Sequence, residues 1–173
     1  GFKGLKAGKA DGALSSRAIK AKEITALKVL GNMQSASAEH VVAIDGLAVI
    51  VHPSNYLGQL PVNVLGKIFA GENWKELGGA DKIIKVYARD DQSGTYDTFK
   101  NLVLGKRLKL TPSAERFESN DELSDRVASD VGGIGFVGLA SVRNAKALAV
   151  SAGDSKALQP EVIYVATEDY PLS

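Results

Sequence analysis

The chain has 173 residues, of which 45% are hydrophobic and 24% charged, so it can form one domain or two small lobes. Lys and Arg number 21 against 20 Asp and Glu, and this balance argues against a nucleic-acid-binding surface, which needs many cationic contacts to phosphates. The chain has no cysteine and only two histidines, which excludes disulfides and thiolate metal sites and disfavours a histidine metal site.

The first forty residues predict a helix end, a strand and a second helix. Gly8 is expected to end the helix in residues 1–10. The short apolar segment 11–16, DGALSS, is typical of a buried strand. Helical spacing of apolar residues predicts a helix over 17–30, with Ser16 as its cap.

The strongest strand pattern covers residues 40–53, HVVAIDGLAVIVHP. It is β-branched on both sides of Asp45-Gly46, and Pro53 closes it. Its near-continuous apolarity indicates a strand that is covered on both faces. A strand of this length could pass between two lobes.

The rest of the chain alternates between the two element types, which predicts an α/β fold. A turn is expected at 73–79, and Asn120 is expected to cap the last of the helices. Helices are expected at 62–71, 94–106 and 120–130, and strands at 83–88, 115–119 and 162–166. Segments 134–140 and 146–151 are expected to be two strands or a strand and a turn.

A strand runs into the residues RDDQSGT and then into a helix, an arrangement that suits an anion site. The start of a helix offers unpaired N–H groups and partial positive charge. Ser93 and Thr95 add hydroxyls, Gly94 allows close approach, and Arg89 adds a planar fork that Asp91 could hold in position. The alternative is that Ser93 only caps the helix and that the charges are solvated.

The turn Ser15-Ser16-Arg17 repeats this arrangement after the expected strand 11–16. Two such turns could face one ligand from two sides. Taken alone, the turn is more often a plain helix cap than a site.

Gly133, Gly135 and Gly138 have the GxGxxG spacing of dinucleotide-binding loops. That interpretation requires a strand before the glycines and a helix that begins on them, whereas here a helix precedes them and a strand contains them. They are expected to allow a tight turn and close packing. A Ser-His-Asp hydrolase is also disfavoured, because the chain has no GxSxG motif and His52 precedes Pro53 at a strand end.

Several motifs in order resemble the PstS-like phosphate-binding proteins of bacterial ABC transporters. They are DGLAVIVHPSN (45–55), KIFAGENWKELGG (67–79), YARDDQSGTYDTF (87–99) and GGIGFVGLA (132–140), with further similarity at 4–23 and 167–173. The resemblance covers nearly the whole chain.

The resemblance implies a type 2 periplasmic-binding-protein fold, in which two α/β lobes joined by crossing strands close on phosphate. Residues 1–43 and 147–173 would form part of the first lobe, and 44–146 the second, with Asp45-Gly46 at the first crossing. The chain begins without a methionine and after the family's leading strand and helix. It is therefore expected to be a piece of a longer protein with an incomplete first lobe.

The family's phosphate contacts carry over where the residues match. Arg89, Ser93, Gly94 and Thr95 match its arginine and Ser-Gly-Thr step, and Asp91 matches the acid that orients the arginine. Ser16 lies where the first lobe offers a ligand-facing residue. Some members have an aspartate in that turn, which accepts a proton from the ligand, and its replacement here leaves the selectivity between phosphate and sulfate open.

The resemblance implies a solute-binding module for phosphate uptake and not an enzyme. It implies neither a metal nor an organic cofactor, no nucleic acid, and a periplasmic or extracellular location. Phosphate and the membrane subunits of an ABC transporter are the expected partners, and the open sheet position of an incomplete lobe could pair two copies of the chain. The alternatives are a phosphate-sensing or scaffold module of the cell envelope and, less favoured, a hydrolase.

Overall fold

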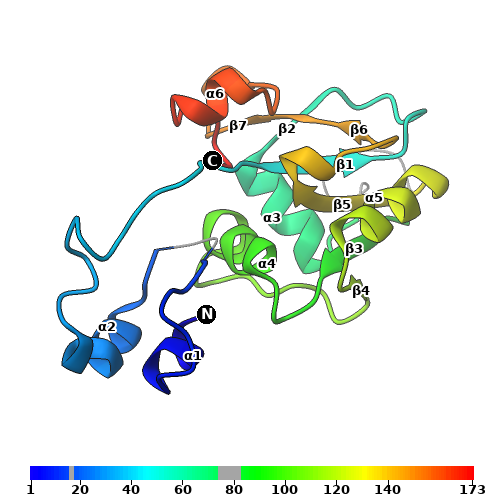
Figure 1. The fold of residues 1–173 in the computed structure, drawn as a ribbon. Coiled ribbons are helices and arrows are strands. Elements are labelled where there is room, and N and C mark those ends of the chain that lie inside the picture. The colour runs from blue at the N-terminus through cyan, green and yellow to red at the C-terminus, as the bar shows by residue number, and fades with distance from the viewer. Residues whose placement is uncertain (16–17, 74–82) are drawn as a thin grey trace. The chain divides into compact units, whose positions relative to one another are not determined.

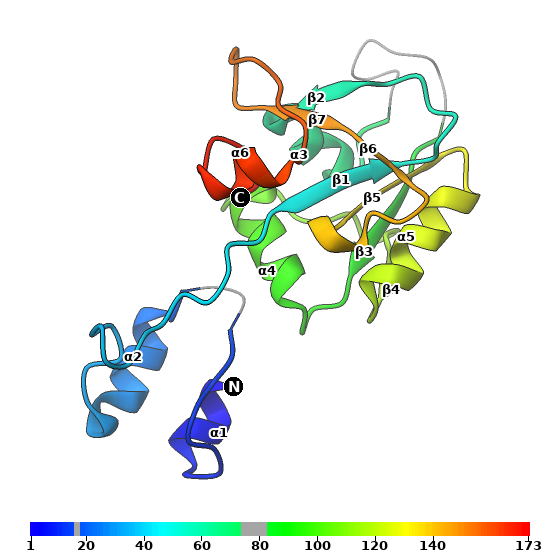
Figure 2. The ribbon, with the colours of Figure 1, turned by 45° about the horizontal axis from the view of Figure 1, so that its top comes forward.

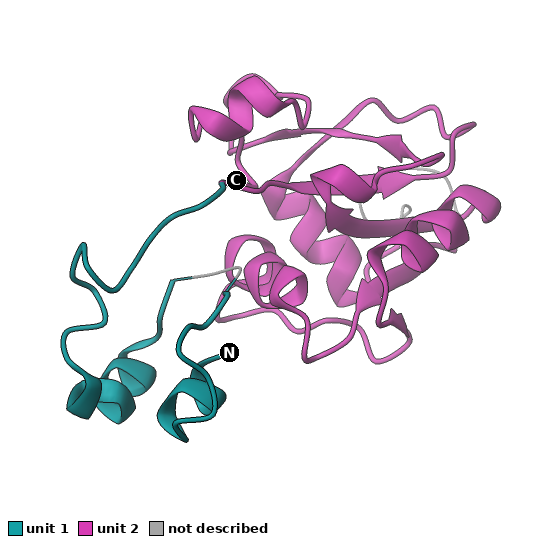
Figure 3. Ribbon diagram, viewed as in Figure 1, with its two compact units in different colours: residues 1–43 teal, residues 44–173 magenta. Residues whose placement is uncertain are grey.

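The computed structural model describes residues 1–15, 18–73 and 83–173. The chain divides into two compact units, residues 1–43 and residues 44–173 (Figure 3). The predicted division into lobes, with 44–146 as the second, stays a prediction. Residues 147–173, which the resemblance assigned to the first lobe, lie in the second unit.

Unit 1 contains the two predicted helices, both shorter than expected. Helix α1 spans Phe2–Lys6, and Gly8 follows it with a φ of 64°, a left-handed conformation that suits glycine. Helix α2 spans Ala21–Leu27 and continues as a 3₁₀ turn over Lys28–Leu30. The backbone N–H of Lys20 donates to Glu23 Oε2 (2.8 Å) at the start of α2, whereas the expected cap Ser16 lies outside the described residues.

The strand predicted over 11–16 is not formed in its described part, residues 11–15. Leu14 is 91% exposed there. Both sheets of the described chain are built from residues after Gly46, so this segment has no neighbouring strand to bond with. An apolar segment without a partner strand gains little from an extended conformation.

Unit 2 is built on a mixed five-stranded sheet, as Figure 1 and Figure 2 show. Its strand order is β4-β3-β5-β1-β6, in which β3 is parallel to β4 and β5, and β1 is antiparallel to β5 and β6. Two further strands, β2 and β7, form a small parallel sheet. The bounds are β1 Leu47–Val51, β2 Gln59–Pro61, β3 Lys85–Arg89, β4 Glu115–Phe117, β5 Gly133–Gly138, β6 Lys146–Ala147 and β7 Ala149–Ser151.

Helices cover both faces of the large sheet. Helix α3 (Val62–Ala70) and helix α4 (Gly94–Phe99), which continues as a π-helical segment over Lys100–Leu104, pack on one face. Helix α5 (Asn120–Ser129) packs on the other face. All five residues of β1 are therefore buried, as its apolar pattern predicted.

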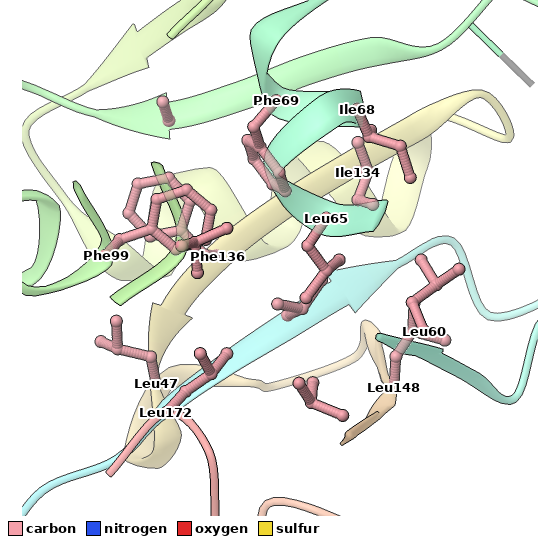
Figure 4. Packing of buried hydrophobic residues seen from close by; sticks show 14 of the residues in the cluster. Leu47, Leu60, Leu65, Ile68, Phe69, Phe99, Ile134, Phe136, Leu148 and Leu172 are labelled. Carbon is pink, nitrogen blue, oxygen red and sulfur yellow. The ribbon is translucent and has the colours of Figure 1, made fainter. Parts of the chain in front are cut away.

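The main core contains a group of aromatic rings (Figure 4). Phe99 of α4 stacks on Phe136 of β5, with ring centroids 3.8 Å apart and planes 4° from parallel. Phe69 of α3 meets both rings edge-on. These contacts fix α3 and α4 against the centre of the sheet.

One predicted strand is shorter than expected, and another is wrong. Residues 40–46 are irregular and mostly exposed, so the strand begins only at Leu47. Residues 162–166 form helix α6 (Val162–Ala166), in which only Val165 is buried. β-branched residues favour a strand where they pack within a sheet. Val162 and Ile163 are exposed, so this run lacks that packing.

Most of the turn predicted at 73–79 lies outside the described residues. A short 3₁₀ turn over Leu139–Ser141 follows β5. In the part of the chain that the structure describes, no helix is long and apolar enough to cross a membrane.

The glycines of the GxGxxG spacing all lie in β5, and only a short 3₁₀ turn, not an α-helix, follows them. A Cβ on Gly135 would lie 2.7 Å from Leu123 Cδ2 and 2.9 Å from Val127 Cγ2. Glycine thus lets α5 approach the sheet closely, which confirms the packing role expected of it.

Candidate functional site

One edge of the large sheet brings the predicted anion-binding residues together. Strands β3, β4 and β5 are parallel and end at this edge, and β1, antiparallel to β5, begins there with Leu47 opposite Gly138. Helices α4 and α5 begin just after β3 and β4. We call this region the carboxyl edge and define it as residues 45–46, 89–95, 117–120 and 138. Open α/β sheets usually bind ligands at such an edge.

Arg89 is the last residue of β3, and its side chain is only 12% exposed. Its Nε donates to the Phe117 carbonyl (3.2 Å), Nη2 to the Glu118 carbonyl (2.6 Å) and Nη1 to Asn120 Oδ1 (2.6 Å). A guanidinium carries five N–H donors, so these three bonds leave one on each terminal nitrogen. The group is therefore held in place and keeps one N–H on each terminal nitrogen for a further acceptor.

The Ser-Gly-Thr step begins helix α4, as predicted. Ser93 is the cap, and its Oγ accepts from the Tyr96 N–H (3.3 Å). Asp90 shapes the turn before it, because its carbonyl accepts from the Ser93 N–H (3.2 Å) and its Oδ1 from the Gln92 N–H (2.7 Å). The N–H groups of Gly94 and Thr95 lie in the first helical turn, where a helix supplies no acceptor.

Asp91 does not hold the Arg89 guanidinium as expected. It is largely exposed, and its Oδ1 lies 3.2 Å from Arg116 Nη2. The acid beside Arg89 is Asp90, with Oδ2 3.8 Å from Nη2. Asp90 and Asp91 are adjacent in the exposed turn, and the sequence alone does not show which of the two carboxylates faces Arg89.

Arg116 is a second guanidinium, in contact with the carboxyl edge, that the sequence did not indicate. Its Nη1 donates to the Arg89 carbonyl (2.6 Å), and its Cζ lies 4.5 Å from the centre of the Tyr96 ring. It thus ties the end of β3 to the first turn of α4 and to Asp91. Its place opposite Ala88, one residue before Arg89, on the parallel neighbour β4 could be inferred only from the strand register.

Asn120 was expected to cap α5, but Ser119 does so. Ser119 Oγ accepts from the N–H groups of Asp121 (3.2 Å) and Glu122 (3.4 Å). The amide of Asn120 is therefore available for Arg89. In the sequence both residues are good caps, and the choice between them changes which side chain faces the carboxyl edge.

Asp45 and Gly138 complete the edge at the junction of β1 and β5. Asp45 Oδ1 accepts from the Gly46 N–H (2.9 Å). A Cβ on Gly138 would lie 3.3 Å from Asp45 Oδ2 and 3.9 Å from Asn120 Nδ2. The glycine thus keeps space open between a carboxylate and an amide. The remaining predicted residue, Ser16, lies outside the described residues.

His52 does not join the carboxyl edge, because it follows the end of β1, at the other end of that strand. Its Nδ1 lies 2.7 Å from Ser54 Oγ and also accepts from the Ser54 N–H (3.1 Å). This is a local turn contact in an exposed loop. It provides no third group that would orient the imidazole as a base.

Two coupled pKa shifts lie near the starts of β3 and β5, away from the carboxyl edge. Burial and a 2.6 Å hydrogen bond to Asp130 raise the pKa of Tyr87 to about 12. The same bond, with Lys85 (2.9 Å) and the Gly132 N–H, lowers the pKa of Asp130 to about 2. These groups join the start of β3 to the end of α5, and we assign them to stability.

A hollow of about 640 Å³ in the described chain is also separate from the carboxyl edge. Its walls come from residues 152–158 and from α6 with the segment after it. Lys156, Glu168 and Asp169 line it with charges of both signs. It offers no set of donors comparable to that around Arg89, so the chemistry and not the volume selects the site.

A family model described as a PBP superfamily domain matches residues 1–173. Protein SphX of Synechococcus elongatus is 35% identical over 98% of this chain and 53% of its own length. The phosphate-binding protein PstS of Bacillus subtilis is 34% identical over 79% of this chain and 45% of its own. The chain thus spans about half the length of these curated relatives.

Two solved structures share the fold. A putative phosphate ABC transporter substrate-binding protein of Clostridium perfringens, with bound phosphate, has a TM-score of 0.80 and 28% identity, over 99% of this chain and 66% of that one. An ABC-type phosphate transport receptor of Vibrio cholerae has a TM-score of 0.75 and 29% identity, over 99% and 67%. The predicted α/β fold class is confirmed, and the chain belongs to the PBP superfamily, with PstS-like proteins among its relatives.

Proposed function

We propose that this chain is the phosphate-binding part of a solute-binding protein for ABC-type uptake. The observation that carries the proposal is Arg89. Its largely buried guanidinium is held at the carboxyl edge, beside the start of α4, with one N–H still available on each terminal nitrogen. A fork of this kind matches two oxygens of a phosphate.

The start of α4 supplies the remaining donors on this side. The N–H groups of Gly94 and Thr95 have no acceptor in the helix, and the Ser93 hydroxyl accepts from Tyr96 and keeps its own proton to donate. The Thr95 hydroxyl adds another donor. Charge-assisted bonds and the helix dipole both favour an anion here.

The second side of the site is assigned by resemblance. Ser16 would contact the phosphate from the first lobe, and closure of the two lobes would exclude water from the cleft. Phosphate would reach the membrane subunits of an ABC transporter from a periplasmic or extracellular protein. The names of the relatives describe binding proteins and a transport receptor, which supports binding without catalysis and without a cofactor.

Calorimetric titration of the full-length protein with phosphate, arsenate and sulfate tests the proposal. We expect saturable binding of one phosphate per protein, with arsenate competing for the same site. The ratio of phosphate to sulfate affinity decides the selectivity that the turn at residues 15–17 leaves open. Absence of phosphate binding would overturn the proposal.

Two further measurements separate the alternatives. Turnover of phosphate esters by the purified protein would favour a hydrolase. Unchanged uptake of labelled phosphate by cells that lack the gene would favour a sensing or scaffold role. We expect no turnover and reduced uptake.

A further inference from the structure

We propose that Asn120 positions the guanidinium of Arg89 for the anion, in the role that the sequence suggested for Asp91. The effect on the anion rests on the proposed function, whereas the positioning of Arg89 does not. Asn120 is a positioning residue in this proposal because it acts through Arg89.

All three acceptors that hold the guanidinium come from one segment, residues 117–120 between β4 and α5. Two are the backbone carbonyls of Phe117 and Glu118, and the third is Asn120 Oδ1 at 2.6 Å. All three are neutral. A neutral acceptor orients the guanidinium without neutralising its charge, whereas a carboxylate at hydrogen-bonding distance would neutralise it. The acid beside Arg89, Asp90, has its Oδ2 3.8 Å from Nη2, beyond hydrogen-bonding distance.

The position of Asn120 is itself fixed by packing. Asn120 is the first residue of α5, and Ser119 caps that helix, so the asparagine amide is not used as a cap. Leu123 and Val127 of α5 are fully buried and lie close to Gly135 of β5. Because these side chains fill the space between α5 and β5, the helix cannot move toward the sheet. The backbone of Asn120, in the first turn of this helix, therefore has a fixed position.

The amide of Asn120 also has a defined direction. Because Oδ1 accepts from Arg89, the two N–H donors of Nδ2 point elsewhere, and Nδ2 lies 3.9 Å from the Cβ position of Gly138. Asp91 meanwhile pairs with Arg116, which leaves the expected acid outside the contacts of the guanidinium.

The test uses the full-length protein with ¹⁵N-labelled arginine and the variants Asn120→Ala, Asn120→Asp and Asn101→Ala. Asn101 is an exposed asparagine and provides the matched control. Hindered rotation about the Nε–Cζ bond gives separate Nη proton signals, and those of Arg89 are identified by their loss in Arg89→Lys. We expect separate signals in the parent, N120D and N101A, and merged signals in N120A.

Phosphate titration of the same proteins gives the second readout. We expect N120A to bind roughly tenfold or more weakly than the parent and N101A to bind like the parent. Separate Nη signals in N120A would overturn the positioning role, whatever the phosphate result. Merged signals with unchanged phosphate affinity would overturn its importance for binding. A parent that does not bind phosphate would overturn the proposed function, while the Nη signals still decide the positioning.

Discussion

The chain contains the same local pattern twice, and only one copy forms the predicted strand. Residues 11–30 and 83–104 both read as an apolar strand, a turn with hydroxyls and an arginine, and a helix. In unit 2 the pattern forms β3, the Ser-Gly-Thr turn and α4. In unit 1 the helix forms, but the described part of the strand stays irregular.

The difference lies in the neighbours and not in the local sequence. Strand β3 lies between β4 and β5, and Val86, Tyr87 and Ala88 are buried. Leu14, at the matching place in unit 1, is 91% exposed. A helix satisfies its own backbone hydrogen bonds, whereas a strand needs a partner, so the same pattern predicts the helix more safely than the strand.

The largest expected effect comes from the core that supports β3. Phe136→Ala should lower the free energy of unfolding by about 3–5 kcal/mol, because its ring stacks on Phe99, meets Phe69 and leaves a cavity when removed. Leu14→Ala, in the unformed strand, should change it by less than about 0.5 kcal/mol. Urea unfolding followed by fluorescence measures both. A comparable loss for Leu14→Ala would show that residues 11–16 are buried in solution.

The turn after β3 gives the next effect. Arg89→Ala should weaken phosphate binding by the full-length protein roughly tenfold to a hundredfold, because it removes a charged fork whose hydrogen bonds are worth about 1.5–3 kcal/mol each. Arg89→Lys keeps the charge but not the fork and should also lose affinity. Arg107→Ala, at an exposed arginine, is the control. Parental affinity in Arg89→Ala, measured by calorimetry, would remove Arg89 from the site.

The fold of unit 2 was largely predictable because its patterns are long and buried. The strand core at 47–51, the helix at 62–70 and the helix that starts at residue 94 all follow from apolar spacing and terminal glycine or hydroxyl residues. Helix α6 was missed because β-branched residues favour a strand only where a sheet can accept them. Sequence alone does not show whether such a sheet position exists.

Only the part of the candidate site that lies within residues 89–95 could be predicted from the sequence. Arg89 and the Ser-Gly-Thr step are neighbours in sequence, so local logic finds them. Asn120 and Arg116 reach the edge through the register of β3 and β4 and through the choice of cap for α5. Both depend on tertiary packing, which no local pattern specifies.

The next comparison uses one glycine from each unit and concerns a smaller change in stability. Gly135→Ala should destabilise the protein by about 1–3 kcal/mol, because the new Cβ would lie 2.7 Å from Leu123 Cδ2 in a filled core. Gly12→Ala should be neutral or slightly stabilising, since no atom beyond its two chain neighbours lies within 4 Å of its Cβ position. Thermal unfolding of both variants measures the difference. Equal destabilisation would contradict the open surroundings of residue 12.

Acid should weaken unit 2 through Asp130. Its folded pKa of about 2 lies below the ordinary value of 3.8, so the stability it contributes is present above about pH 4 and is lost as the pH falls toward 2. Tyr87→Phe removes the hydrogen bond that contributes most to this shift, so its acid unfolding should begin at higher pH. Circular dichroism between pH 7 and pH 2 follows this. If the parent and Tyr87→Phe unfold over the same pH range, the stabilising role of the Tyr87–Asp130 hydrogen bond is contradicted.

The smallest expected effect is the loss of a side-chain hydrogen bond at the start of one helix in each unit. Ser119→Ala should cost about 1 kcal/mol, because Ser119 Oγ accepts from the N–H groups of Asp121 and Glu122 at a helix packed on the core. Glu23→Ala in unit 1 should cost only a few tenths of that, since the bond from Lys20 to Glu23 is exposed and competes with water. Urea unfolding measures the first change, and amide chemical shifts of residues 21–27 measure any fraying of α2. Because Asn120 keeps its bond to Arg89 only while α5 begins at the same residue, Ser119→Ala should also broaden the Arg89 Nη signals. Sharp signals would show that core packing alone holds the start of α5.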